Sequence, residues 1–189
     1  MVLLAKEQVE VKLTPQEIVE KTTIADVYRA VKNLDGVIYK TKLIYSDYFS
    51  NLSHNDIYIK PENLQKTGSF KLRGAYNCIS QLSEEQKAHG VIAASAGNHA
   101  QGVAYAAQQL GVKAVIVMPA TTPLLKVEAT RAYGAEVVLS GDSFDDAAAK
   151  AVELQQEFNY TFIHPFNDIE VILGQGTTAL EIIDDLKDV

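Results

Sequence analysis

Four short apolar runs, separated by helical segments, constrain the fold more than any other feature of this sequence. They lie at residues 91–94, 114–118, 135–139 and 161–163. Helical segments start between them near Asn98, Pro123 and Asp142, and glycines stand where the first two should stop, at Gly111 and Gly134. Strands of a parallel sheet are buried on both faces, and right-handed crossovers connect them. The pattern therefore predicts a compact α/β unit with a parallel sheet and helices on both faces.

The two ends of the chain have helices but no sheet of their own. Residues 14–17 form a capping box, apolar residues follow at helical spacing, and Gly36 ends that segment. Residues 57–59 are predicted to form a strand, and a last helix is predicted to begin near Thr177. Both ends are interpreted as an incomplete portion of a second α/β domain. The predicted organisation is residues 1–69 for the N-terminal segment of that domain, 70–165 for the small α/β domain, and 166–189 for the return into the larger one.

Composition and charge exclude several classes of partner. The net charge of −7 argues against nucleic acid, which needs a basic face, and no apolar run approaches the roughly 18 residues of a membrane span. The four histidines lack the spacing of a metal site, so none is predicted. A single cysteine, Cys78, cannot form an internal disulfide, which favours the reducing cytoplasm.

The segment 67–75, Thr-Gly-Ser-Phe-Lys-Leu-Arg-Gly-Ala, contains a candidate nucleophile. If Ser69 caps the helix, Lys71 and Arg73 lie in its first turn, where cations are disfavoured. The helix dipole and Arg73 would then lower the pKa of Lys71, and a neutral amine is what attacks an aldehyde. On this pattern alone, a surface lysine on a frayed turn is the favoured interpretation.

The segment 94–102, Ala-Ser-Ala-Gly-Asn-His-Ala-Gln-Gly, follows a predicted strand and opens a helix. Its backbone N–H groups would point outward at the carboxyl edge of the sheet, which suits a substrate carboxylate. An ordinary capped turn is the alternative. Residues 174–177, Gly-Gln-Gly-Thr, are a second candidate anion loop, although a turn followed by a helix cap explains them equally well.

Together these segments resemble the fold-type II pyridoxal-phosphate enzymes, and most closely the threonine dehydratases, also called threonine ammonia-lyases. The resemblance lies in residues 60–77, Lys-Pro-Glu-Asn-Leu-Gln-Lys-Thr-Gly-Ser-Phe-Lys-Leu-Arg-Gly-Ala-Tyr-Asn, and in residues 95–102, Ser-Ala-Gly-Asn-His-Ala-Gln-Gly. Shorter matches follow at residues 118–119, 134–138 and 174–177. The resemblance covers nearly the whole chain from about Thr14.

The resemblance implies a role for individual residues. Lys71 would bind pyridoxal 5'-phosphate as a Schiff base and then act as the general base at the substrate α-carbon. Phe70 would pack beside the cofactor, and Asn98 would contact its ring hydroxyl. The substrate carboxylate site would be lined by Ser95, Ala96, Gly97 and His99.

The implied reaction is β-elimination and deamination of L-threonine, and of L-serine, to a 2-oxo acid and ammonia. The family suggests homo-oligomers, as dimers or tetramers. The sequence leaves open whether the role is in isoleucine synthesis or threonine catabolism. It also leaves open a serine racemase or serine dehydratase, and a truncated, non-catalytic fragment.

Two departures from the family pattern stand out. Residues 41–43 read Thr-Lys-Leu where family members usually carry Thr-Pro-Leu, which predicts a local loop change. The glycine-rich phosphate cup and the residue facing the pyridine nitrogen would lie downstream of Val189. The chain is therefore interpreted as the N-terminal part of such an enzyme, and residues 1–189 alone are expected to be essentially inactive.

Overall fold

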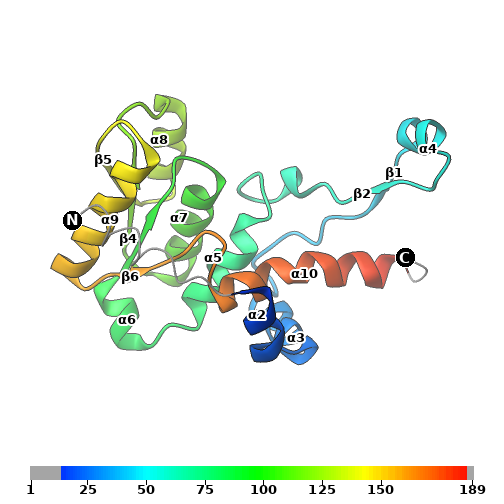
Figure 1. The fold of residues 1–189 in the computed structure, drawn as a ribbon, viewed down its shortest axis with the longest axis horizontal. Helices are drawn as coiled ribbons and strands as arrows, with labels where there is room; N and C mark the ends of the chain where they lie inside the picture. Colours follow the sequence, from blue (N-terminus) through cyan, green and yellow to red (C-terminus); the bar gives the residue numbers. More distant parts are fainter. Residues whose placement is uncertain (1–13, 187–189) are drawn as a thin grey trace.

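A four-stranded parallel sheet lies at the centre of the larger part of the molecule (Figure 1). The computed structural model describes residues 14–186. The strands run in the order β5-β4-β3-β6, with bounds β3 Val91–Ala94, β4 Ala114–Met118, β5 Glu136–Leu139 and β6 Thr161–Phe162. All three neighbouring pairs are parallel. The predicted sheet is therefore confirmed, and each predicted apolar run contains one of its strands.

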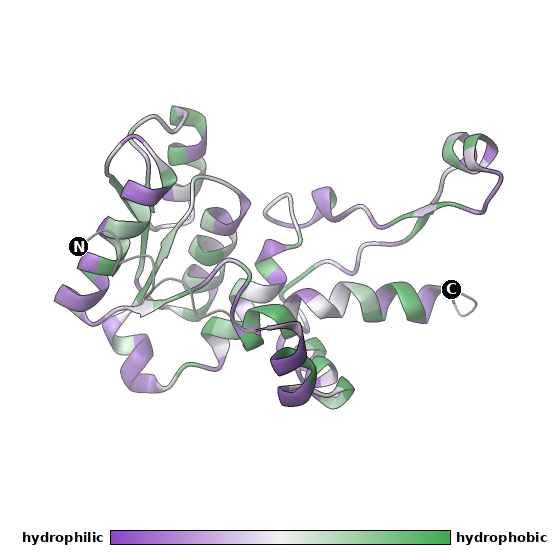
Figure 2. Ribbon diagram, in the orientation of Figure 1, coloured by the Kyte–Doolittle hydropathy of each residue, from purple (hydrophilic) through white to green (hydrophobic). Residues whose placement is uncertain are grey.

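Helices cover both faces of this sheet, as predicted. Alternate residues of β3 and β4 face opposite sides: Ala93 and Ile116 belong to one buried cluster, and Ile92 and Val117 belong to another. The first cluster includes helices α5 (Lys71–Ser80) and α7 (Asn98–Leu110), and helix α8 (Leu124–Arg131) adds Val127. The second is closed by α9 (Phe144–Phe158). Figure 2 shows the apolar strands lying between these helices.

A short helix, α6 (Glu84–His89), precedes β3 and was not predicted. It begins with a capping box in which Ser83 and Gln86 bond each other's backbone N–H groups. This Ser-x-x-Gln pattern is a sequence signal for a helix start. In the described part of the chain, no helix is long and apolar enough to cross a membrane.

The last helix, α10 (Ile169–Asp185), begins earlier than predicted and packs along α5. Asp168 caps it by accepting a hydrogen bond from the Val171 N–H. The prediction of a helix start near Thr177, with an anion loop at 174–177, was wrong, because these residues lie inside the helix. The first glycine of this segment has a packing role instead. A Cβ on Gly174 would lie 2.5 Å from the main-chain oxygen of Arg73.

The N-terminal helical segment is divided in two. Helix α2 (Pro15–Lys21) begins at the predicted capping box of Thr14 and Glu17. Helix α3 (Ile24–Asn33) begins afresh after Thr23, whose N–H and hydroxyl donate to the Asp26 carboxylate. The apolar spacing predicted one segment, but adjacent threonines interrupt it and the second one starts a new helix.

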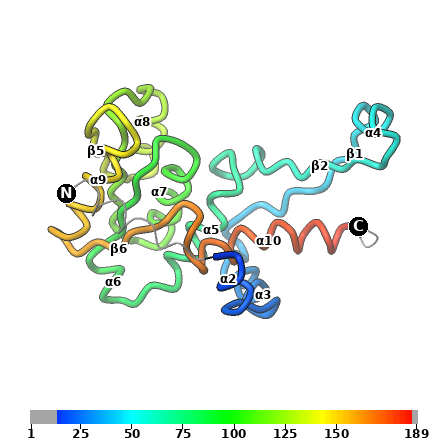
Figure 3. The backbone as a smooth tube through the Cα atoms, viewed as in Figure 1, coloured from blue at the N-terminus to red at the C-terminus, as the bar shows by residue number. Residues whose placement is uncertain are grey.

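Residues 40–60 form an arm that leaves the body of the molecule and returns to it (Figure 3). The predicted strand at 57–59 is observed as β2 (Tyr58–Ile59), which pairs antiparallel with β1 (Ile44–Tyr45). Helix α4 (Asp47–Ser53) lies at the far end, and the 3-10 turn η1 (Glu62–Leu64) follows on the return. The arm exposes large apolar side chains, including Ile44, Tyr48, Phe49 and Leu52.

Candidate functional site

Lys71 is the first residue of α5, close to the position that the sequence predicted. The residue that caps the helix is one position later than the predicted Ser69. Phe70 occupies the cap position with a helical backbone, and the buried Ser69 lies one residue further out. Ser69 Oγ accepts a long hydrogen bond of 3.4 Å from the Lys71 N–H. The first turn of α5 therefore begins at Lys71.

The Lys71 side chain is half-buried and reaches the segment that follows β6. Its Nζ donates a hydrogen bond to the carbonyl oxygen of Pro165 at 2.6 Å and lies 5.4 Å from the centre of the Phe70 ring. Burial lowers the pKa of the Lys71 amine, because desolvation penalises the charged ammonium. A larger neutral fraction at neutral pH makes this amine better suited to attack a carbonyl carbon.

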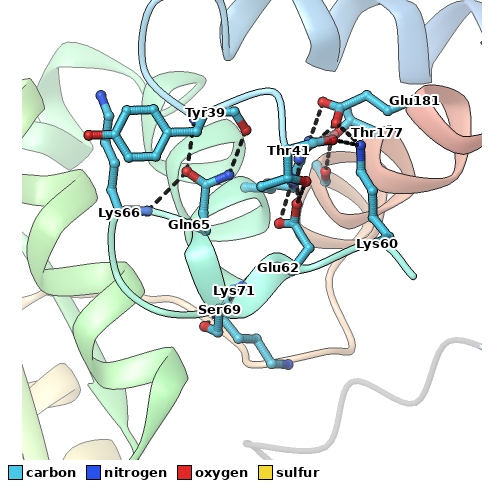
Figure 4. A network of polar contacts seen from close by, with 12 residues as sticks. Tyr39, Thr41, Lys60, Glu62, Gln65, Lys66, Ser69, Lys71, Thr177 and Glu181 are labelled. Atoms are coloured by element: carbon cyan, nitrogen blue, oxygen red, sulfur yellow. Dashed lines mark hydrogen bonds and ion pairs between the residues drawn. The ribbon is translucent and has the colours of Figure 1, made fainter. Parts of the chain in front are cut away.

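Arg73 is not the cause of this pKa shift, which corrects the expectation from the sequence. The Arg73 side chain is fully buried and donates to the carboxylates of Glu62 on η1 and Glu181 on α10. Burial disfavours its charge, but hydrogen bonds to both carboxylates raise the pKa of Arg73 and keep it protonated. Its charge is compensated locally, so burial alone accounts for the lowered pKa of Lys71. Figure 4 shows the contacts of this region.

The loop 95–97 leads from β3 into α7, and α7 lies directly against the start of α5. A Cβ on Gly102 would meet the main-chain carbon of Lys71 at 3.1 Å, so only glycine gives this close approach without displacement. Residue 102 closes the second sequence motif, and its packing explains why the two motifs lie side by side.

The start of α7 is the place where the sequence predicts an anion site. Gly97 at the helix cap makes no side-chain capping bond, and its own N–H donates to Ser95 Oγ at 3.3 Å. The first-turn N–H groups of a helix have no intrahelical acceptor. Ser95, Ala96 and Gly97 are half-buried, and Asn98 is exposed. An anion at this position would meet first-turn amides and the positive end of the helix dipole.

His99 lies beneath the loop and is only 4% exposed. Its Nε2 lies 2.9 Å from the Ile163 carbonyl oxygen, which can only accept, so Nε2 carries the proton. Burial is the main factor that lowers the pKa of His99 to about 4, and the charges of Lys71 and His164 add to it. The neutral ring leaves Nδ1 as a buried acceptor without a partner. His99 therefore supports the loop through its hydrogen bond to the Ile163 carbonyl oxygen.

The turn after β6 is part of the site, and sequence reasoning missed it. Pro165 and Ile163 supply the carbonyl oxygens that Lys71 and His99 contact. His164 Nδ1 accepts from the N–H groups of Phe166 and Asn167, which fixes the turn. Because β6 is parallel to its neighbour β3, the ends of both strands meet at one sheet edge. A polar turn directly after the fourth apolar run was the signal available in the sequence.

A cleft of about 820 Å³ lies nearby, between α6, β6 and the start of α10. His164 and Asp168 are among its lining residues, but Lys71 and the 95–98 loop are not. The cleft is therefore a separate feature from the surroundings of the lysine amine.

The residues around Lys71 fit an aldehyde cofactor that carries an aromatic ring. A half-buried amine with a lowered pKa is present, and the ring of Phe70 lies beside it. Two buried polar atoms, Thr67 Oγ1 and His99 Nδ1, have no hydrogen-bond partner. Thr67 belongs to the same sequence segment as Lys71, and His99 belongs to the segment that opens α7. Buried polar atoms are nearly always paired, so these two atoms are available for hydrogen bonds to a bound molecule.

Comparisons with known proteins agree with this arrangement. The family model described as pyridoxal-phosphate dependent enzyme matches residues 34–189. L-threonine ammonia-lyase of Thermotoga maritima is 54% identical over 167 residues, which cover 88% of this chain and 42% of that protein.

Two solved structures are similar in fold. The processed form of threonine deaminase isoform 2 from Solanum lycopersicum gives a TM-score of 0.82 at 44% identity, covering 89% of this chain and 48% of that chain. The structure of maize serine racemase gives a TM-score of 0.86 at 33% identity, covering 89% of this chain and 51% of that chain. The chain thus spans about half, or less, of the length of these three proteins.

Proposed function

This chain belongs to the family of pyridoxal-phosphate dependent enzymes, and from that premise we propose that its protein deaminates L-threonine, and also L-serine, by β-elimination. The products are 2-oxobutyrate from threonine, pyruvate from serine, and ammonia from both. The observation that carries the proposal is the half-buried Lys71 amine, whose pKa burial lowers, beside the amide-lined start of α7.

We assign the binding roles to the residues that surround this amine. Lys71 would hold the cofactor covalently, the Phe70 ring would pack beside it, and Asn98 would contact its ring hydroxyl. Bound pyridoxal phosphate supplies the electron sink that lets the α-carbon of an amino acid lose a proton. The substrate carboxylate binds at the start of α7, where the main-chain amides and Ser95 are available as donors.

Lys71 is also the proposed general base. With the substrate bound, the free and neutral Nζ of Lys71 would take the proton from the substrate α-carbon. The Lys71 ammonium would then return this proton to the β-hydroxyl as the Cβ–O bond breaks, so that the hydroxyl group leaves as water and the amine is neutral again. The released enamine takes up one water and gives the 2-oxo acid and ammonia, so no net water is consumed. Burial of the amine supports this role, because it raises the neutral fraction that can accept a proton.

The preference for threonine rests on the relatives. The enzyme named L-threonine ammonia-lyase is 54% identical, whereas the serine racemase of maize is 33% identical despite its TM-score of 0.86. That close fold likeness makes racemisation or dehydration of serine the second candidate. The test is coupled detection of 2-oxobutyrate from L-threonine, alongside chiral analysis after incubation with L-serine. 2-Oxobutyrate supports the proposal. D-serine without a 2-oxo acid overturns it in favour of the racemase, and no product with either substrate favours a non-catalytic scaffold.

We also propose that the protein acts in the cytoplasm and that it forms a homo-oligomer. Residues 70–165 would form its small domain, and residues 1–69 and 166–189 would belong to the larger one. The exposed apolar side chains of the arm, such as Tyr48 and Leu52, support association with another surface. Light scattering coupled to size-exclusion chromatography tests this association. A monomer at all concentrations contradicts it.

A further inference from the structure

A buried network of charged side chains lies directly behind the start of α5 (Figure 4). Arg73 is its centre and donates to Glu62 through Nε and Nη2, each at 2.8 Å. Nη1 donates to Glu181 at 2.7 Å and to Thr177 Oγ1 at 3.1 Å. The fork of the guanidinium thus joins η1, α5 and α10 at one point.

The network closes on itself through two further residues. Lys60 Nζ donates to Glu181 at 2.6 Å and also to the Thr41 carbonyl oxygen. Thr41 Oγ1 donates to Glu62 at 2.7 Å. Two cations therefore face two carboxylates, and the network carries no net charge. A neutral network has little long-range effect on the charge of Lys71, so its influence on that residue is one of geometry.

Lys71 and Arg73 point in opposite directions from the same turn. Residues two apart on a helix lie about 200° apart around its axis. Figure 4 shows the Lys71 side chain leading away from Glu62, Thr177 and Glu181. With the Arg73 fork held behind it, the first turn of α5 has little freedom to rotate about the helix axis.

We propose that Arg73 is a positioning residue for Lys71. Through Glu62, Thr177 and Glu181 it fixes the rotation of the first turn of α5, and so directs the lysine amine at the turn after β6, where Pro165 lies. The proposal rests on the proposed function in one respect, which is that Lys71 is the residue that binds pyridoxal phosphate.

Asn77 offers a matched comparison. It is fully buried on the same helix, and like Arg73 it connects α5 to α10, through hydrogen bonds to the main-chain oxygen and carboxylate of Glu170. It lies beyond the first turn and makes no contact with the network. Loss of either side chain weakens the packing of α5 on α10, but only loss of the Arg73 fork frees the turn that carries Lys71.

The experiment compares Arg73→Lys with Asn77→Ala in the protein incubated with pyridoxal phosphate. After borohydride reduction, peptide mapping measures the rate at which the pyridoxyl group appears on Lys71, at a temperature where circular dichroism shows every variant folded. Arg73→Lys keeps the charge but loses the fork, so the rate falls roughly tenfold to a hundredfold, and label shifts to other lysines. Asn77→Ala labels Lys71 at the wild-type rate. Equal rates in Arg73→Lys and the wild type overturn the proposal, and so does an equal loss in both variants.

A second pair of variants serves if Arg73→Lys does not fold. Thr177→Val removes one acceptor of the Arg73 fork at nearly constant volume, and Thr177→Ser restores the hydroxyl. A slower labelling of Lys71 in Thr177→Val that Thr177→Ser reverses supports positioning, while unchanged labelling in both contradicts it. The outcomes separate the two proposals: labelled Lys71 without 2-oxobutyrate from threonine defeats the proposed function alone, and fast labelling in Arg73→Lys defeats the positioning role alone.

Discussion

The amine of Lys71 and the carbonyl oxygen of Pro165 are joined by a hydrogen bond of 2.6 Å, although 94 residues separate them in the sequence. This contact brings the start of α5 to the turn after β6. It also leaves the amine half-buried, which lowers its pKa. A single contact thus connects the fold of the sheet to the reactivity of the proposed catalytic lysine.

Replacement of Lys71 is expected to abolish deamination. Lys71→Ala removes the amine, and Lys71→Arg keeps a positive charge but introduces a guanidinium that stays protonated and cannot bind the aldehyde covalently. Both variants should lose all measurable 2-oxobutyrate formation from threonine in the cofactor-loaded protein. Lys66→Arg is the control, because Lys66 lies over the rings of Tyr39 and Tyr105 instead. Activity in Lys71→Arg would contradict the assigned role.

The neutral state of His99 is expected to make the fold sensitive to acid. Its pKa is about 4 in the folded protein, whereas an unfolded histidine titrates near 6.5. Between these values the unfolded chain binds the proton more tightly, so stability present above pH 6.5 is lost as the pH falls towards 4. His99 alone is expected to lower the free energy of unfolding by about 3 kcal/mol over this pH range.

Denaturant unfolding at several pH values measures that loss. The variant His99→Gln keeps a donor for the Ile163 carbonyl oxygen but does not titrate, so its stability should depend less on pH between 6.5 and 4. A pH dependence identical to that of the wild type would show that another group is responsible.

Two glycines of α10 are expected to respond in opposite ways to replacement by alanine. A Cβ on Gly174 would lie 2.5 Å from the Arg73 main-chain oxygen, so Gly174→Ala must separate α10 from α5 and should destabilise by about 1–3 kcal/mol. A Cβ on Gly176 would meet Val27 at an ordinary 3.6 Å. Gly176→Ala should therefore stabilise the helix by up to about 1 kcal/mol, because glycine is a poor helix former.

Thermal or urea unfolding of the two alanine variants gives the comparison. Similar effects of both substitutions would mean that α10 does not pack on α5 as closely as the structure shows.

The sheet could be predicted from sequence because its signal is local and redundant. Each of β3 and β4 is an unbroken apolar run flanked by helical segments, and both are buried along their whole length. The lysine motif and the loop before α7 were found for a related reason, since each lies in a short contiguous segment at a strand or helix boundary.

Features that depend on distant residues could not be predicted in this way. Arg73 resembled a cation on an exposed first turn because its partners, Glu62 and Glu181, lie 11 and 108 positions away. Gly174 resembled a loop residue because the need for a small side chain comes from α5. The contact with Pro165 was missed for the same reason, since the sheet order that places β6 beside β3 does not follow from either strand alone.

The central claim is that Lys71 is the residue that binds pyridoxal phosphate, and its most direct test is chemical. The cofactor-loaded protein is reduced with borohydride, digested and mapped by mass spectrometry. The structure predicts a pyridoxyl group on Lys71, the half-buried amine with a lowered pKa beside Phe70. A pyridoxyl group on Lys66 or Lys126, with Lys71 unmodified, would contradict the account.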